Sequence, residues 1–206
     1  MIGLAALPAV AEPVTIAALG DSLTAGYGLP AEQGFVPVLN DWLDGQGVDA
    51  VVTNAGVSGD TTAGGLARVD WTLTPEVDAV IVALGGNDLL RGIDPAVSRA
   101  NLQGILEKLR VERDLPVLLI GLEAGTNYGT DYKRAFDGMY VELAETYGAD
   151  LVPSFLAPLT AEVDLATALG RYMQGDRIHP NAAGVEVIVA EIGPSVADLA
   201  ARAGVD

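Results

Sequence analysis

The run from Ala79 to Leu84, which reads AVIVAL, constrains the fold of this chain more than any other feature. A continuous apolar run of this length buries both faces of a strand. Such strands lie in the middle of parallel sheets that helices cover on both sides, whereas a strand with one solvated face alternates apolar and polar residues. The run therefore predicts the central strand of a three-layer α/β/α sandwich.

Short β-rich runs and longer helical patterns alternate along the rest of the chain. The other expected strands are Val14–Leu19, Val48–Thr53, Pro116–Ile120 and Asp150–Val152, and the expected helices are Gly34–Gly45, Asp94–Glu112, Asp131–Tyr147 and Ala182–Ala203. Gly193-Pro194 predicts a kink or break in the last of these helices. The order predicts an α/β, flavodoxin-like domain with about five parallel strands and right-handed crossovers.

We expect residues 12–206 to form a single domain, because 206 residues suit one core better than two. Residues 1–11 are almost entirely apolar and end in Ala9-Val10-Ala11, a pattern typical of the end of a secretory signal. This segment is interpreted as the remnant of such a signal, which predicts a periplasmic or secreted protein. No run approaches the ~20 apolar residues of a membrane-spanning helix, so stable membrane insertion is not expected.

The charge and the rare residues exclude several classes of function. Asp and Glu outnumber Lys and Arg by 28 to 11, and a net charge of -17 disfavours nucleic acid and anionic membranes as partners. There is no cysteine and only one histidine, which excludes zinc–thiolate and multi-histidine centres. We therefore expect no metal, no cofactor and a small-molecule substrate, and we expect a monomer.

Four loops carry the residues suited to catalysis, and each lies where the predicted sheet brings strand ends together. Ser22 follows the first strand in GDSLTAGYG, Gly59 follows the second in NAGVSGDT, and Asn87 follows the central strand in GGND. Asp176 and His179, in DRIHP, precede the last helix. Ligands of open α/β sheets bind outside the carboxyl ends of the strands, so these loops predict one site.

These residue types fit nucleophilic catalysis on a carbonyl group. The Ser22 hydroxyl is the candidate nucleophile, His179 the general base, and Asp176 the group that orients the imidazole. The N–H of Gly59 and the amide of Asn87 are candidate donors to an oxyanion. Each residue alone also has an ordinary structural interpretation, such as a helix cap for Ser22 or a turn for Asn87.

At these four blocks the chain resembles the SGNH, or GDSL-type, esterase and lipase family, in family order and over nearly the whole sequence. Within it, GGNDLLRG and Asn127-Tyr128-Gly129 are most similar to the small bacterial thioesterases that also act as lysophospholipases and arylesterases. The resemblance implies Ser22, Asp176 and His179 as the catalytic triad. It also implies an oxyanion hole formed by the Ser22 N–H, Gly59 and Asn87, and a periplasmic location.

Apolar loop residues are the candidates for contact with the acyl group. They are Tyr27, Leu29, Leu89, Leu90, Phe155 and Leu156, and core packing is the alternative for each. The negative charge of the chain disfavours highly anionic substrates unless Arg68 or Arg91 offsets it locally.

Three other interpretations stay open at this point. A carbohydrate O-deacetylase of the same family would use the same catalytic groups. A flavodoxin-like module could bind a small ligand at the same loops, although the chain has neither a P-loop nor a G-x-G-x-x-G motif after the first strand. An α/β-hydrolase is disfavoured because GDSLT lacks the final glycine of G-x-S-x-G.

Overall fold

The computed structural model describes residues 12–204, so the segment 1–11, predicted to be a signal remnant, lies outside the described residues. Five parallel strands form one sheet in the order β2-β1-β3-β4-β5. The strands are β1 (Val14–Gly20), β2 (Ala50–Gly56), β3 (Ala79–Ala83), β4 (Val117–Ile120) and β5 (Asp150–Val152). Every residue of β3 is buried, and the predicted central position of this strand is confirmed.

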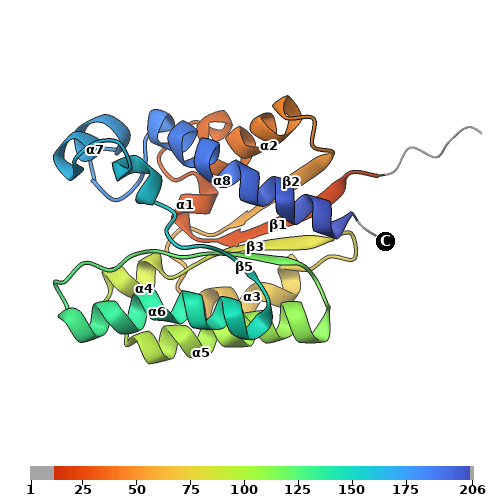
Figure 1. The fold of residues 1–206 in the computed structure, drawn as a ribbon, viewed down its shortest axis with the longest axis horizontal. Coiled ribbons are helices and arrows are strands. Elements are labelled where there is room, and N and C mark those ends of the chain that lie inside the picture. The colour runs from red at the N-terminus through yellow and green to blue at the C-terminus, as the bar shows by residue number, and fades with distance from the viewer. Residues whose placement is uncertain (1–11, 205–206) are drawn as a thin grey trace, which may run out of the picture.

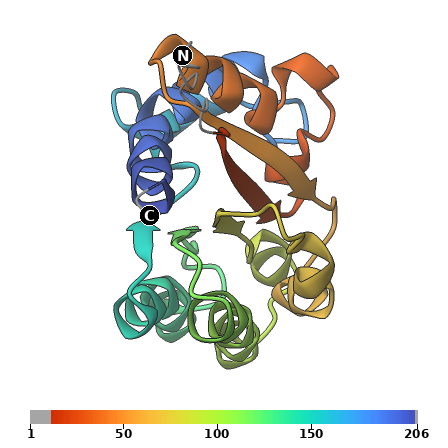
Figure 2. The same ribbon diagram turned by 90° about the vertical axis from the view of Figure 1, so that its right-hand side faces the viewer.

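Helices cover both faces of the sheet (Figures 1 and 2). One layer contains α2 (Phe35–Gly45) and α8 (Ala182–Ala203), and the other contains α3 (Thr62–Thr72), α5 (Pro95–Leu106) and α6 (Thr130–Tyr147). The short α1 (Ser22–Ala25), α4 (Gly86–Leu90) and α7 (Leu165–Tyr172) lie in the left half of Figure 1. The three-layer α/β/α fold predicted from the sequence is confirmed.

The register of the three strands β2, β1 and β3 aligns their carboxyl ends. Gly20 of β1 pairs with Gly56 of β2 on one side and with Ala83 of β3 on the other. The order also reverses at β1, because the chain moves outward to β2 and then returns to the opposite side of β1. Such a reversal leaves an opening between the loops that follow the two diverging strands, and ligands bind there.

Two glycines at these strand ends allow α1 to pack directly on the sheet. A Cβ on Gly56 would lie 2.4 Å from the backbone nitrogen of Ala25, and a Cβ on Gly20 would lie 3.0 Å from the carbonyl oxygen of Ala83. The backbone therefore approaches more closely here than any residue with a side chain would permit.

Several elements differ from the sequence-based expectation. The last helix runs unbroken from Ala182 to Ala203 with Pro194 inside it, so of the predicted kink or break, the break is wrong. Its apolar face is buried along most of its length, and Gly193 lies directly against the ring of Trp42. Packing of this kind outweighs the loss of one backbone hydrogen bond at proline. The helix predicted to end at Glu112 is α-helical only to Leu106 and continues as a π-helical turn, Glu107–Glu112.

Irregular structure fills the segment between β5 and α8. It contains two short helices, Ala157–Thr160 and α7, neither of which the strand and helix patterns predict. Within residues 12–204, none of the helices combines the length and apolarity needed to span a membrane.

Replacing Gly56 with alanine tests the close contact between α1 and the sheet. The added Cβ cannot fit without moving the Ala25 backbone, so Gly56→Ala should lower the free energy of unfolding by about 1 to 3 kcal/mol. Urea unfolding measures the change. Gly170→Ala is the matched control, because a Cβ there meets nothing within 4 Å in α7, and we expect it to stabilise by about 0.5 to 1 kcal/mol. Equal effects of the two substitutions would contradict the steric argument.

Candidate active site

Ser22 begins α1 immediately beyond the carboxyl end of β1. The preceding residue, Asp21, caps this helix, since its Oδ1 accepts a hydrogen bond from the Leu23 N–H at 3.0 Å. Gly26 ends the helix in a left-handed conformation with φ 78°. The sharp turn into a single helical turn holds the Ser22 side chain at the edge of the sheet.

Three side chains from two distant parts of the chain form one hydrogen-bonded line. His179 Nε2 lies 2.9 Å from Ser22 Oγ, and His179 Nδ1 lies 2.6 Å from Asp176 Oδ2. The first contact joins residues 157 positions apart. The structure thus places a hydroxyl from early in the chain next to an imidazole from near its end, with a carboxylate on the far side of the ring.

The backbone around Asp176 keeps its carboxylate charged. Its Oδ1 accepts hydrogen bonds from the N–H groups of Ile178 and His179, at 2.9 and 3.1 Å. Arg177, which lies between Asp176 and Ile178, adopts a left-handed conformation with φ 58°. The hydrogen bond from the His179 side chain and those from the two N–H groups lower the pKa of Asp176 to about 2. A carboxylate so placed selects the tautomer with Nδ1 protonated, which leaves Nε2 free to accept a proton from Ser22.

Asn87 and Gly59 lie on linked loops beside Ser22. Asn87 Nδ2 donates to the carbonyl oxygen of Asp60 at 2.9 Å, which uses one of its two hydrogens and orients the amide. Asn87 and Ser22 line the same cavity. Gly59 has φ 88°, and among residues 12–204 no protein acceptor pairs with its N–H or with that of Ser22. These N–H groups and the second hydrogen of Asn87 are available to an oxyanion.

Two arginines hold the backbone of these loops. Arg68 donates to the carbonyl oxygens of Gly20 and Ala55 and forms an ion pair with Asp60 at 2.6 Å. Arg91 donates to the carbonyl oxygen of Gly59 at 2.9 Å. Both side chains therefore stabilise the loops that carry the candidate donors. Sequence reasoning considered them only as a possible basic patch for anionic substrates.

Asp88, the residue after Asn87, is buried, and its hydrogen bonds hold the loops around Asn87 in place. It accepts hydrogen bonds from the N–H and hydroxyl of Thr62 and from the hydroxyl of Ser98. Thr62 begins α3, so this carboxyl group connects the loop containing Gly59 to α4 and α5. The sequence did not indicate that Asn87 faces the cavity while Asp88 is buried, because this difference depends on residues from other loops.

Asp21 is a second buried acidic residue, only 2% exposed, next to the candidate nucleophile. Burial raises the pKa of Asp21 to about 6, against the opposing effect of its hydrogen bond from Leu23. No arginine or lysine pairs with this carboxyl group among the described residues. Its charge is therefore costly to the folded state.

An apolar cavity of about 220 Å³ opens beside Ser22 and Asn87. Three of the predicted acyl-contact residues line it: Leu89, Leu90 and Leu156. The other apolar residues in its wall, which sequence reasoning missed, are Leu23, Leu122, Met173 and Ile178. The charged residues in the wall are Asp21, Glu123 and Arg177.

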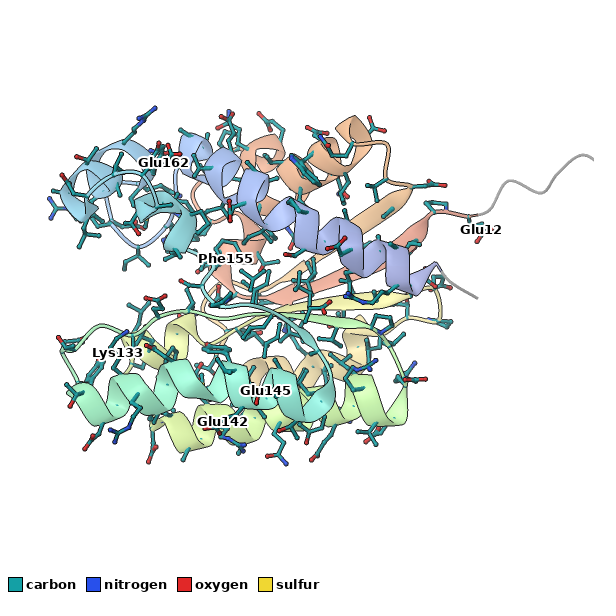
Figure 3. The ribbon with its side chains drawn as sticks, viewed as in Figure 1. Glu12, Lys133, Glu142, Glu145, Phe155 and Glu162 are labelled. Atoms are coloured by element: carbon teal, nitrogen blue, oxygen red, sulfur yellow. The ribbon has the colours of Figure 1, made fainter. Side chains whose placement is uncertain are left out.

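The remaining predicted contact residues lie elsewhere. Tyr27 and Leu29 line a much smaller hollow beside His179. Phe155 is 2% exposed and packs on Phe35 with ring centroids 4.9 Å apart. In Figure 3 it lies toward the middle of the molecule beside the strands. This corrects the prediction that Phe155 contacts substrate, because the hydrophobic core already encloses its ring.

The described residues contain no group of three or more His, Asp or Glu side chains placed to hold a metal ion. The chemistry available to this site is that of a hydroxyl, an imidazole, a carboxylate and convergent N–H donors. Together these groups can attack a carbonyl carbon and stabilise the resulting anion.

Residues 18–187 match the model of the GDSL-like lipase/acylhydrolase family. "Esterase TesA" of Pseudomonas aeruginosa is 38% identical over 96% of this chain and 95% of its own length. "Thioesterase 1/protease 1/lysophospholipase L1" of Escherichia coli is 40% identical over 81% of this chain and 76% of its own length. Among solved structures, AlinE4, an SGNH-hydrolase family esterase, is 46% identical with a TM-score of 0.73, covering 92% of this chain and 98% of that one.

Replacing Asp21 with asparagine tests the cost of its buried charge. Because folding raises the pKa of Asp21 from 3.8 to about 6, the folded state binds this proton more tightly. The resulting stabilisation is complete below pH 3.8 and is lost as the pH rises through 6, a change on the order of 3 kcal/mol. Asparagine keeps an oxygen for the Leu23 N–H without the charge. Asp21→Asn should therefore stabilise the protein at pH 8 more than at pH 4.

Urea unfolding at pH 4, 6 and 8 measures this difference. A stability change that is the same at all three pH values would show that the charge of Asp21 is not the cause.

Proposed function

The chain belongs to the GDSL-like lipase/acylhydrolase family, and we propose that it hydrolyses its substrate through an acyl-enzyme formed on Ser22. Its relatives are named as esterases and thioesterases, and the protein is a carboxylic ester hydrolase of this family. The observation that carries the proposed mechanism is the line of hydrogen bonds from Ser22 through His179 to Asp176.

In the first half-reaction, His179 Nε2 accepts the Ser22 hydroxyl proton while Oγ forms a bond to the substrate carbonyl carbon. The carbonyl π electrons move to oxygen and form an oxyanion. The N–H groups of Ser22 and Gly59 and the free hydrogen of Asn87 donate to it. When the carbon–oxygen or carbon–sulfur bond breaks, the alcohol or thiol leaves with the proton from His179.

Water completes the reaction by the reverse sequence. His179 removes a proton from the water as its oxygen attacks the acyl-enzyme, and the proton then returns to Ser22 Oγ as the carboxylic acid leaves. Asp176 stabilises the imidazolium formed in each half-reaction through the 2.6 Å contact with Nδ1. No step requires a metal ion or an organic cofactor.

The apolar cavity is the proposed site of the acyl chain. Its volume of about 220 Å³ is slightly below the ~300 to 1,000 Å³ of pockets for drug-sized ligands, which favours a short to medium acyl group. Arg68 is paired with Asp60, and the charged side chains in the cavity wall, Asp21, Glu123 and Arg177, carry no net positive charge together. The site therefore offers little attraction to a strongly anionic substrate. We therefore propose neutral or zwitterionic esters and thioesters of such acids.

Three further proposals concern the state of the protein. One sheet and one continuous core support a single domain over residues 12–206. The monomeric state stays a prediction, to be tested by light scattering. Export stays a prediction that depends on residues 1–11, outside the described part of the chain.

Labelling with a fluorophosphonate tests the nucleophile directly. The reagent transfers its phosphonyl group to an activated serine and releases fluoride, so intact-mass analysis should show one adduct on the wild-type chain. Ser22→Ala should show none. An adduct that persists on Ser22→Ala would place the nucleophile elsewhere.

Replacing Asn87 with alanine tests the oxyanion hole. Loss of one such donor costs roughly 3 to 4 kcal/mol in the reaction barrier of other hydrolases, so Asn87→Ala should lower kcat by about 100- to 1,000-fold with a small change in KM. Steady-state kinetics on a nitrophenyl ester measure the effect, and thermal unfolding checks that the variant is folded. Unchanged kcat in a folded variant would make Asn87 a turn residue only.

A further inference from the structure

The contact between Ser22 and His179 joins the segment after β1 to the loop before α8, and few hydrogen bonds connect these two parts of the chain. The residues between Met173 and Pro180 form a loop whose neck is an isolated antiparallel bridge. The neck is closed by hydrogen bonds from Gln174 N to His179 O and from Asn181 N to Tyr172 O, each 2.8 Å long. These bonds define the shape of the loop but not its position relative to Ser22.

Among residues 12–204, only two hydrogen bonds connect the segment 20–34 to the segment 171–181. One is the contact between Ser22 and His179. The other runs from the side chain of Gln174 to the carbonyl oxygen of Tyr27 at 2.8 Å, across 147 positions of sequence. The second bond involves no reacting atom, so it is available to hold the first in place.

The side-chain nitrogen of Gln174 uses both of its hydrogens in this region. Its Nε2 also donates to the carbonyl oxygen of Pro180 at 2.9 Å. A primary amide has two N–H hydrogens, and here one goes to each loop. The amide plane is therefore fixed by one carbonyl from the Ser22 side and one from the His179 side.

The backbone around Gly28 closes over the same amide. A Cβ on Gly28 would lie 2.3 Å from Gln174 Oε1, and Gly28 has φ 77°. The loop after α1 thus lies directly against the side chain of Gln174, and a side chain at position 28 would not fit between them. A close fit of this kind restricts the relative movement of the two loops.

The connection also positions an aromatic ring against the general base. The ring of Tyr27 lies 4.7 Å from the imidazole of His179, centroid to centroid, at an interplanar angle of 40°. Tyr27 is the residue whose carbonyl Gln174 holds. Holding that carbonyl keeps the ring beside the imidazole, where it limits rotation of His179 away from Ser22.

We propose that Gln174 is a positioning residue that sets the geometry between Ser22 Oγ and His179 Nε2 by joining the nucleophile loop to the base loop. This inference rests on the proposed function, because it assumes that Ser22 and His179 react. Gln174 touches no reacting atom itself. Misplacement of a catalytic group by about 1 Å can cost on the order of 100-fold in rate, so a loosened connection should be visible in kcat.

Two variants separate positioning from general stability. Gln174→Met keeps a side chain of similar length and removes both donors. Gln174→Glu keeps the shape but, when ionised, directs negative charge at two carbonyl oxygens, whereas the protonated acid can donate one hydrogen bond. Gln46→Ala, at the exposed end of α2, is the control and should leave kcat unchanged.

The measurement is kcat per active site, with the sites counted by fluorophosphonate titration so that misfolded protein does not contribute. We expect Gln174→Met to lower this kcat by about 10- to 100-fold with less than about threefold change in KM. For Gln174→Glu, the ratio of its kcat to that of wild type should rise as the pH falls from 8 to 5, because the protonated acid restores a donor. For Gln174→Met the ratio should not depend on pH.

A kcat per titrated site within twofold of wild type in Gln174→Met would overturn the proposal. If that variant does not fold, a pH-independent ratio in Gln174→Glu would overturn it instead. Failure of the proposed function has a different signature, since the wild-type protein would then not be titrated by the fluorophosphonate at all.

Discussion

The site depends on one constraint, which is that three neighbouring parallel strands end at the same level of the sheet. Gly20, Gly56 and Ala83 are paired across β2, β1 and β3, so the loops that follow these strands begin side by side. Short loops are then enough to bring together the hydroxyl of Ser22, the N–H of Gly59 and the amide of Asn87. The close approach at Gly56 brings α1 onto this edge, and a slip of either strand pair would separate the candidate nucleophile from the candidate oxyanion donors.

Polar groups beneath the site serve mainly to hold loops rather than to react. Arg68 binds the ends of β1 and β2, and Asp88 binds the start of α3. Because these side chains are partly or fully buried, their hydrogen bonds are protected from competition with water and fix backbone atoms more firmly than surface bonds do. Asp21 is a buried carboxyl group that forms no ion pair among the described residues, and it lies beside the candidate nucleophile, where groups with shifted pKa values commonly gather in enzymes.

The fold was predictable because its signals are local. An all-apolar run such as Ala79 to Leu84 can only be a buried strand or helix, and its length and branched residues favour the strand. The candidate triad residues could be named from the sequence because four blocks occur in order at strand ends. Phe155 illustrates the limit, since an aromatic residue in an irregular segment suits a core and a pocket equally well. Pro194 illustrates another, since burial of α8 against the sheet outweighed the local cost of proline.

The sequence by itself determined the layer architecture, the central strand and the identity of the groups that can attack and stabilise a carbonyl, because periodicity and residue chemistry depend on neighbours in the chain. Only the tertiary structure decided which apolar residues enclose the cavity. It alone also revealed that Arg91 holds Gly59 and that Gln174 connects the two halves of the site. These contacts form between residues tens to more than a hundred positions apart. Every residue has a backbone carbonyl, so the residue type does not show which carbonyl accepts such a bond.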